Sequence, residues 1–213
     1  GAVAPGRGPR PRPRGVVACG ALLRQRHTAE ACVAAAGWPM ACIETDADFD
    51  EYTHEDLFSC LEPPWSDWAA TAAHLRTVEN PRRTFHELFE RALKAWLAGG
   101  AGTGQSWAQF RSRCSAALQR VVARLGSGES AVVVSSGGAI AAMLQPLLDV
   151  PDARVPALHS AVFNASITQL LTRGDAVSAF VSDSLDDHVK FMFDDGSGDM
   201  VRRDYTPRRF DRA

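Results

Sequence analysis

The sequence predicts an α/β protein: a three-layer α/β/α sandwich with a mostly parallel, mixed central sheet. Short β-branched apolar runs such as Val16–Cys19 and Ala131–Val134 are separated by stretches of helical periodicity. This pattern is typical of parallel strands joined by crossover helices. Near the other end of the chain, Phe163–Leu170 and Ala176–Val181 are separated by Gly174 and Asp175. Such a pair predicts an antiparallel hairpin, and therefore a mixed sheet.

Length and composition indicate one domain with a substantial core. The chain has 213 residues, 46% of them hydrophobic, and a formal net charge of −2. This charge gives no argument for a nucleic-acid partner. No apolar run approaches the roughly 20 residues that span a bilayer, and no signal-peptide core is present near the start. We therefore expect a cytoplasmic protein with no membrane and no nucleic-acid partner.

The cysteines argue against a metal site or a disulfide framework. There are five, an odd number, and none has the C-x-x-C or related spacing of metal ligands. The sequence therefore predicts reduced thiols, no metal and no cofactor.

The domain boundaries follow from composition. Residues 1–14 end in alternating prolines and arginines, from Pro9 to Arg14, and such a run lacks the donors and apolar side chains that strands and helices need. They are interpreted as a disordered or non-native tail. Residues 15–213 are expected to form a single domain, with a polar tail from about Asp194.

In the first third of the chain, Val16–Cys19 is predicted as a strand, Ala21–Ala36 as a helix and Ala41–Ile43 as a short strand. A short helix should follow Thr53, with Asp56 completing a capping box. The apolar face predicted for the first helix consists of Leu22, Leu23, Ala29, Cys32, Val33 and Ala36.

The middle of the chain is predicted to be helical. Thr84–Glu87 and Ser106–Gln109 both have the capping-box pattern, and the glycine-rich stretch 99–104 connects the two helices. The inward residues of the first are Phe85, Leu88, Phe89, Ala92, Leu93, Trp96 and Leu97; those of the second are Trp107, Phe110, Cys114, Ala117, Leu118, Val121 and Leu125. These aromatic residues are interpreted as core rather than as a ligand site.

The stretch with the clearest chemistry is Ser135-Ser136-Gly137-Gly138, which joins a predicted buried strand to a helix. A small-residue turn of this kind aims free backbone N–H groups at one point and favours an anion, above all a phosphate. Two further polar clusters, Arg24–Glu30 and Asp50–Glu55, follow other predicted strands, where α/β folds place their sites. A cation, an acid and a helix N-terminus together favour phosphoryl chemistry.

Four segments, in order, resemble the histidine phosphatase superfamily, the phosphoglycerate-mutase-like phosphatases. Leu22–Glu30 is similar to the family's L-x-R-x-x-x-T-A motif, and Phe49–Glu55 to its acid-bearing loop. Val132–Gly138 resembles its V-V-x-H-G-G motif, and Asn164–Thr168 its late strand. The resemblance covers roughly residues 15 to 190 and implies hydrolysis of a phosphate ester through phosphohistidine, without a metal.

The resemblance also implies roles for individual residues. Arg24 would clamp the phosphate, Glu51 would protonate the leaving oxygen, and Ser136 and Gly137 would bind phosphate oxygens. Ser136 stands where most members have a histidine; a serine can donate one hydrogen bond but carries no positive charge. The other residues considered for the pocket are His27, His54, Asn164 and His188.

The family's Arg-His-Gly motif, which supplies the nucleophilic histidine, has no counterpart here. Without a nucleophile a covalent phosphoenzyme cannot form. The chain is therefore expected to be truncated or degenerate, with impaired hydrolysis or phosphate binding only. Because the missing strand is usually central in the family, its absence would leave a gap in the sheet.

Two other functions stay open. An α/β-hydrolase-type esterase would use Ser136, then Asp183 or Asp186, then His188, in the order of that fold. A non-catalytic pseudophosphatase would bind a partner instead. The expected ligand is phosphate or a phosphorylated small molecule, and a second copy of the chain, forming a homodimer, is also considered as a partner.

Overall fold

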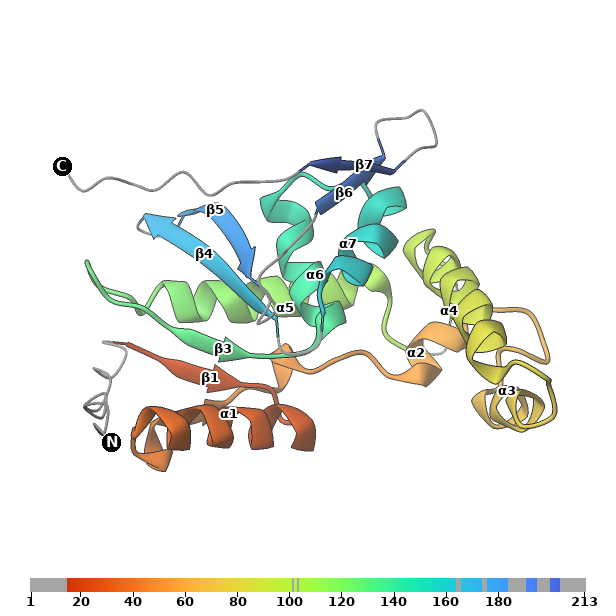
Figure 1. The fold of residues 1–213 in the computed structure, drawn as a ribbon, viewed down its shortest axis with the longest axis horizontal. Coiled ribbons are helices and arrows are strands. Elements are labelled where there is room, and N and C mark those ends of the chain that lie inside the picture. The colour runs from red at the N-terminus through yellow and green to blue at the C-terminus, as the bar shows by residue number, and fades with distance from the viewer. Residues whose placement is uncertain are drawn as a thin grey trace, which may run out of the picture.

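The central sheet is three-stranded and parallel, in the order β2-β1-β3; Figure 1 shows β1 beside β3. The computed structural model describes residues 15–100, 102, 104–163, 166–173, 176–183, 191–194 and 200–203. β1 (Val17–Cys19) lies between β2 (Ile43–Thr45) and β3 (Val132–Val134). Val17 pairs with Ile43 on one side and with Val132 on the other.

The expectation of a gap in the sheet is wrong, because β1 pairs directly with β3. The Val132 N–H donates to Val16 O (2.9 Å) and the Gly20 N–H donates to Val134 O (3.2 Å). Hydrogen bonds from β1 therefore run directly to β3, with no space for a strand between them. β1 rather than β3 is the fully buried strand: Val17, Ala18 and Cys19 are buried, whereas all three residues of β3 are half-buried.

Seven α-helices occur in the described residues. Their bounds are α1 Leu23–Ala36, α2 His54–Phe58, α3 Trp68–Leu75, α4 Pro81–Leu97, α5 Trp107–Val122, α6 Gly137–Leu147 and α7 Val155–Ala161. Three short 3-10 helices are η1 Met40–Cys42, η2 Ala47–Phe49 and η3 Asp152–Arg154. The remaining strands are β4 Ile167–Arg173, β5 Ala176–Asp183, β6 Phe191–Asp194 and β7 Met200–Arg203.

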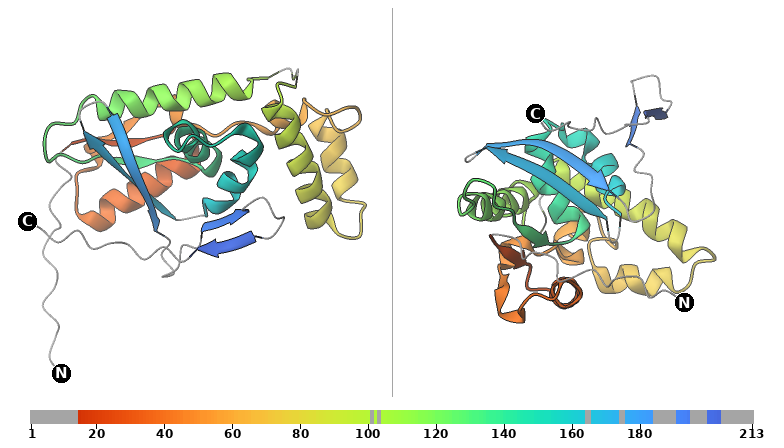
Figure 2. Two further views of the ribbon diagram at one scale, coloured as in Figure 1. Left: turned by 90° about the horizontal axis from the view of Figure 1, so that it is seen from above. Right: turned by 60° about the vertical axis from the view of Figure 1, so that its left-hand side comes forward.

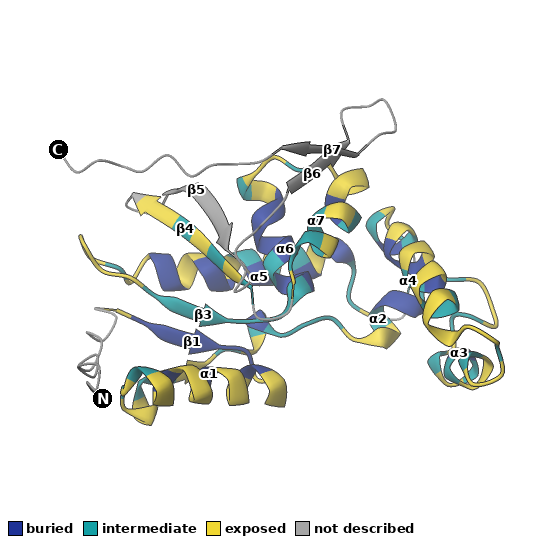
Figure 3. Ribbon diagram, in the orientation of Figure 1, coloured by how far each residue is buried: buried dark blue, intermediate teal, exposed yellow. Residues whose placement is uncertain are grey.

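The helices form layers on the two faces of the sheet, which confirms the predicted α/β class. α1 lies along one face and contacts all three strands. On the other face, Val16 and Ala18 join the main core together with the buried residues of α5 and α6. Because strand side chains alternate, Val17 and Cys19 point to the α1 side. Figure 3 shows this buried strand beside the exposed outer surface of α1.

The antiparallel hairpin is present, but it forms a sheet of its own. β4 and β5 pair antiparallel, as predicted, and they are separate from the parallel sheet. Figure 1 and the right-hand view of Figure 2 place this hairpin on the side of the molecule away from α1. A second antiparallel pair, β6 with β7, occupies part of the region predicted as a polar tail. Residues 1–14 lie outside the described residues.

Two helix predictions are confirmed by their caps. Thr53 and Asp56 form the capping box of α2, and Ser106 and Gln109 form that of α5. The predicted inward residues of α5 from Trp107 to Val121 are buried; the helix ends at Val122, before Leu125.

Three other details of the sequence prediction are wrong. α4 begins at Pro81 behind the N-cap Asn80, so Thr84 lies inside the helix and caps nothing. The strand predicted at 41–43 starts at Ile43, because Met40–Cys42 forms a 3-10 turn after Pro39.

On α1, Ala29 and Val33 are buried as predicted, but Gln25 is buried with them, and Leu23 and Cys32 are exposed. Gln25, Ala29 and Val33 are spaced four residues apart, so they lie in one row facing the sheet.

Candidate functional site

Three connections meet where the parallel strands end. Gly20 follows β1, Phe49-Asp50-Glu51 follows β2 by way of η2, and Ser135–Gly138 follows β3 and opens α6. Parallel strands bring their carboxyl ends to one edge of a sheet, which is the usual place of ligand binding in such folds. The sequence segments that carry Arg24, Glu51 and Ser136 are therefore brought together.

Glu51 occupies the N-terminus of α6. The Gly138 N–H donates to Glu51 Oε2 (2.9 Å), and the Tyr52 N–H donates to Glu51 Oε1 (3.3 Å). A Cβ on residue 138 would collide with Glu51 Oε1 and with the ring of Tyr52. Only glycine at this position leaves room for a carboxylate at the positive end of the helix.

The environment of Glu51 favours its protonated form. Burial raises the pKa of its carboxyl, and this effect outweighs the backbone donors of Gly138 and Tyr52 and the charges of Arg24 and Arg113, which lower it. A carboxyl that retains its proton closer to neutral pH is suited to general-acid chemistry. Arg24 itself is exposed on α1, close enough for its charge to act on Glu51.

Replacing Glu51 by glutamine is expected to make stability less dependent on pH. Because the folded-state pKa of Glu51 is raised above its ordinary value of 4.5, the folded protein binds this proton more tightly than the unfolded chain. The wild type should therefore lose stability as the pH rises through the folded-state pKa, and Glu51→Gln should lack this loss. Urea denaturation from about pH 4 to about pH 8 measures the free energy of unfolding of both proteins, and the variant should gain stability relative to the wild type as the pH rises. A difference in the free energy of unfolding that stays the same at every pH would contradict the prediction.

Gln25 joins the three connections, and sequence reasoning assigned it no role. Its Nε2 donates to Phe49 O (3.1 Å) and to Ser136 Oγ (2.9 Å). Phe49 O also accepts from the Ser135 hydroxyl (2.7 Å). Asp50 Oδ1 accepts from Ala21 N (2.6 Å) and Leu22 N (3.2 Å) and so binds the start of α1. Gln25 lies four positions before Ala29, which was predicted to face the core, and residues with this spacing share one face of a helix. This spacing is the signal in the sequence that could have identified Gln25 as a buried residue.

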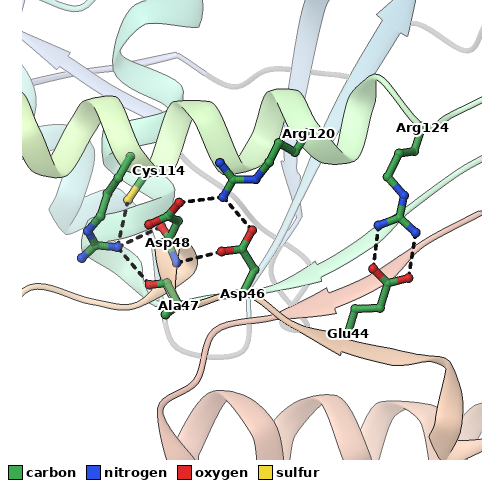
Figure 4. Close-up of polar contacts among 8 residues, drawn as sticks. Glu44, Asp46, Ala47, Asp48, Cys114, Arg120 and Arg124 are labelled. Carbon is green, nitrogen blue, oxygen red and sulfur yellow. Dashed lines mark hydrogen bonds and ion pairs between the residues drawn. The ribbon is translucent and has the colours of Figure 1, made fainter.

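Two arginines of α5, Arg113 and Arg120, and Arg124 in the turn after the helix hold β2 and the segment that leads from it to Glu51 (Figure 4). Arg113 donates to Asp48 O (2.9 Å) and Ala47 O (3.3 Å) in η2. Arg120 bridges the carboxylates of Asp46 and Asp48, both at 2.7 Å, and Arg124 forms two hydrogen bonds with Glu44, at 2.6 and 2.8 Å. Single exposed ion pairs contribute little, but together these contacts tie β2 and the connection after it to α5 and the turn that follows α5.

Two of the histidines considered for the pocket, His27 and His54, lie in the described part of the chain. His54 is exposed and stacks on Trp68, with ring centroids 4.3 Å apart, and His27 is exposed on α1. His159 of α7, which was given no role, has its Nε2 3.2 Å from the hydroxyl of Tyr52, and burial lowers its pKa. Asn164 and His188 lie outside the described residues.

Within the part of the chain that the structure describes, no group of three or more His, Cys, Asp or Glu side chains could hold a metal ion. No helix among these residues is long and apolar enough to cross a membrane.

Comparisons with known proteins agree with the fold. The family model described as histidine phosphatase superfamily (branch 1) matches residues 61–181, more than half of the chain. The native structure of a mycobacterial glucosyl-3-phosphoglycerate phosphatase is 22% identical, with a TM-score of 0.51 over 79% of this chain and 76% of that one. A structure described as mycobacterial hydrolase 2 is 21% identical, with a TM-score of 0.51 over 82% of this chain and 71% of the other. No curated protein matches the sequence.

Proposed function

The chain belongs to the histidine phosphatase superfamily, and from this membership we propose that it binds the phosphoryl group of a phosphorylated small molecule at the N-terminus of α6. The observation that carries the proposal is the Glu51 carboxyl on the Gly138 N–H, with its raised pKa, beside Ser136. One of the similar structures is named for a phosphorylated sugar acid, which fits a ligand of this class.

In the proposed site each residue has a separate task. Arg24 supplies the positive charge that clamps phosphate oxygens, and the Ser136 hydroxyl and the Gly137 N–H donate hydrogen bonds to them. Glu51 in its protonated form gives its proton to the oxygen of the leaving alcohol. A phosphate oxygen would compete with the Glu51 carboxylate for the Gly138 N–H, which favours the protonated acid when ligand is bound.

Hydrolysis is proposed to be strongly impaired. Breaking the P–O bond in this family's way requires a histidine that attacks phosphorus, and the sequence has no Arg-His-Gly motif to supply it. The chain would then hold a phosphorylated ligand without forming a phosphohistidine.

An esterase reaction at Ser136 is less well supported. It needs a base that removes the hydroxyl proton. Among the described residues, the side chain that binds Ser136 Oγ is Gln25, whose amide nitrogen donates to it and cannot accept a proton; His188 lies outside these residues.

Titration of the wild type with inorganic phosphate in a calorimeter tests the proposal. We expect Arg24→Ala to weaken binding about tenfold or more, because a charge-assisted hydrogen bond is lost. Arg26→Ala is the matched control, since Arg26 is exposed two residues further along α1, and it should bind like the wild type. Equal effects of the two variants, or no binding by the wild type, would disprove the site.

Hydrolysis of an aryl phosphate provides the second measurement. The wild type should show only weak turnover, and Glu51→Gln and Arg24→Ala should lower it further. Robust turnover that neither substitution changes would place the chemistry elsewhere. Robust turnover that both abolish would refute the impairment and leave the site assignment intact.

A further inference from the structure

The amide group of Gln25 is fixed in one orientation. Gln25 is 2% exposed, and its Nε2 faces two oxygens, Phe49 O and Ser136 Oγ. A backbone carbonyl can only accept hydrogen bonds, so the Gln25 atom that faces Phe49 O must be the NH₂ group. Both of its hydrogens are then used, one on each oxygen.

This orientation determines what Ser136 can do. Its Oγ accepts from Gln25, so its own O–H must point elsewhere. The hydroxyl does not cap α6, and no described residue accepts a hydrogen bond from it in the structure. Ser136 is half-buried at the first turn of the helix, beside the backbone N–H groups of Gly137 and Gly138.

The packing around Gln25 accommodates this arrangement. A Cβ on Gly20 would collide with Gln25 Oε1, so only glycine leaves space for the amide. Gln25 Oε1 meets no hydrogen-bond donor among the described residues. A buried acceptor without a donor destabilises a fold, and an apolar side chain would fill this position on α1 without that loss.

We propose that Gln25 is a positioning residue that keeps the Ser136 hydroxyl as a hydrogen-bond donor toward a phosphoryl oxygen at the α6 N-terminus. The inference rests on the proposed phosphate site. An acceptor in place of the amide would draw the hydroxyl proton to itself, and Ser136 would then present a lone pair to the anion. The Gln25 amide prevents this reversal.

The test measures the dissociation constant of inorganic phosphate for Gln25→Glu and Gln25→Met. A carboxylate at position 25 accepts from Ser136 and reverses its hydrogen bond, so Gln25→Glu should weaken binding on the order of tenfold to a hundredfold. Gln25→Met removes the donor without adding an acceptor and should have a smaller effect. Gln119→Glu, at an exposed position of α5, controls for the added charge and should bind as the wild type does.

Two further measurements separate positioning from a structural role. In a Ser136→Ala background both Gln25 variants should lose much less affinity, because no hydroxyl remains to be oriented. As the pH falls, protonation of the new carboxyl restores a donor, so Gln25→Glu should recover affinity relative to Gln25→Met. Equal losses with and without Ser136 would overturn the inference.

Different results would disprove the proposed phosphate site and the role of Gln25. A wild type that binds no phosphate removes the site itself. A wild type that binds phosphate with Gln25→Met and Gln25→Glu unchanged overturns only the role of Gln25. Thermal unfolding followed by circular dichroism shows whether each variant is folded, and Gln25→Met carries the test if Gln25→Glu is not.

Discussion

Replacing Gly138 by alanine is expected to destabilise the protein and displace Glu51 from the α6 N-terminus. The new Cβ would collide with Glu51 Oε1 and with Tyr52 Cε1. Tyr52 cannot move aside easily, because its ring packs against Trp96 and Phe110, with centroids 5.1 and 5.4 Å away. Overpacking of this kind costs about 1–3 kcal/mol. We expect a loss of that size in the free energy of unfolding, measured in urea.

The neighbouring glycine supplies the matched control. A Cβ on Gly137 would meet only Val162 atoms, the nearer at 3.7 Å, an ordinary van der Waals contact. Gly137→Ala should therefore keep the wild-type stability to within about 1 kcal/mol, the size of the helix-propensity difference. Equal destabilisation by both substitutions would mean that the collision with Glu51 is not the cause.

The consequence for the site is separate from the loss of stability. A Glu51 carboxyl pushed out toward solvent is no longer subject to the burial that raises its pKa. In Gly138→Ala, the further substitution Glu51→Gln should then change the pH dependence of stability less than it does in the wild type. This double-variant comparison tests whether the buried position of Glu51 at the Gly138 N–H is what raises the pKa of its carboxyl.

The parts of the fold that were predictable from the sequence are those fixed by local chemistry. The capping boxes at Thr53 and Ser106 are formed within a few residues and needed no knowledge of the rest of the chain. The buried face of α5 followed from its apolar spacing in the same way. The turn 135–138 was recognisable because a strand followed by small residues and a helix has few alternative structures.

The parts that sequence reasoning missed depend on contacts between distant segments. α1 has no distinct apolar side, so its rotation on the sheet is set by packing, and this rotation buried Gln25 rather than Leu23. His159 contacts Tyr52, which is 107 positions away. The predicted start of α4 was wrong for another reason. Thr84–Glu87 has a capping pattern, but Asn80 and Pro81 provide an earlier and equally good one.

The direct pairing of β1 with β3 is also non-local. The expectation of a gap treated the sheet as a fixed frame from which one strand is missing. Backbone N–H and C=O groups that are buried without partners are costly, and the pairing of β1 with β3 satisfies them.

Replacing Trp96 by alanine is expected to cause the largest loss of stability. Its side chain is 1% exposed, its ring lies 5.3 Å from that of Trp107 and 5.5 Å from that of Phe110, and its indole N–H donates to Gln105 O (2.7 Å). Removing a buried tryptophan costs about 3–5 kcal/mol, a large part of the roughly 5–15 kcal/mol that stabilise a typical domain. Urea unfolding should show a loss of this size.

Two further variants separate the contributions of Trp96. Trp96→Phe keeps an aromatic ring but leaves the Gln105 carbonyl without its donor, so about 1–3 kcal/mol should be lost. Leu23→Ala removes a large apolar side chain that is 65% exposed on α1, and it should change stability by no more than about 0.5 kcal/mol. Because Trp96 supports the ring of Tyr52, which adjoins Glu51, Trp96→Ala should also weaken phosphate binding, whereas Leu23→Ala should not. Wild-type affinity in a folded Trp96→Ala protein would show that the site does not depend on this aromatic support.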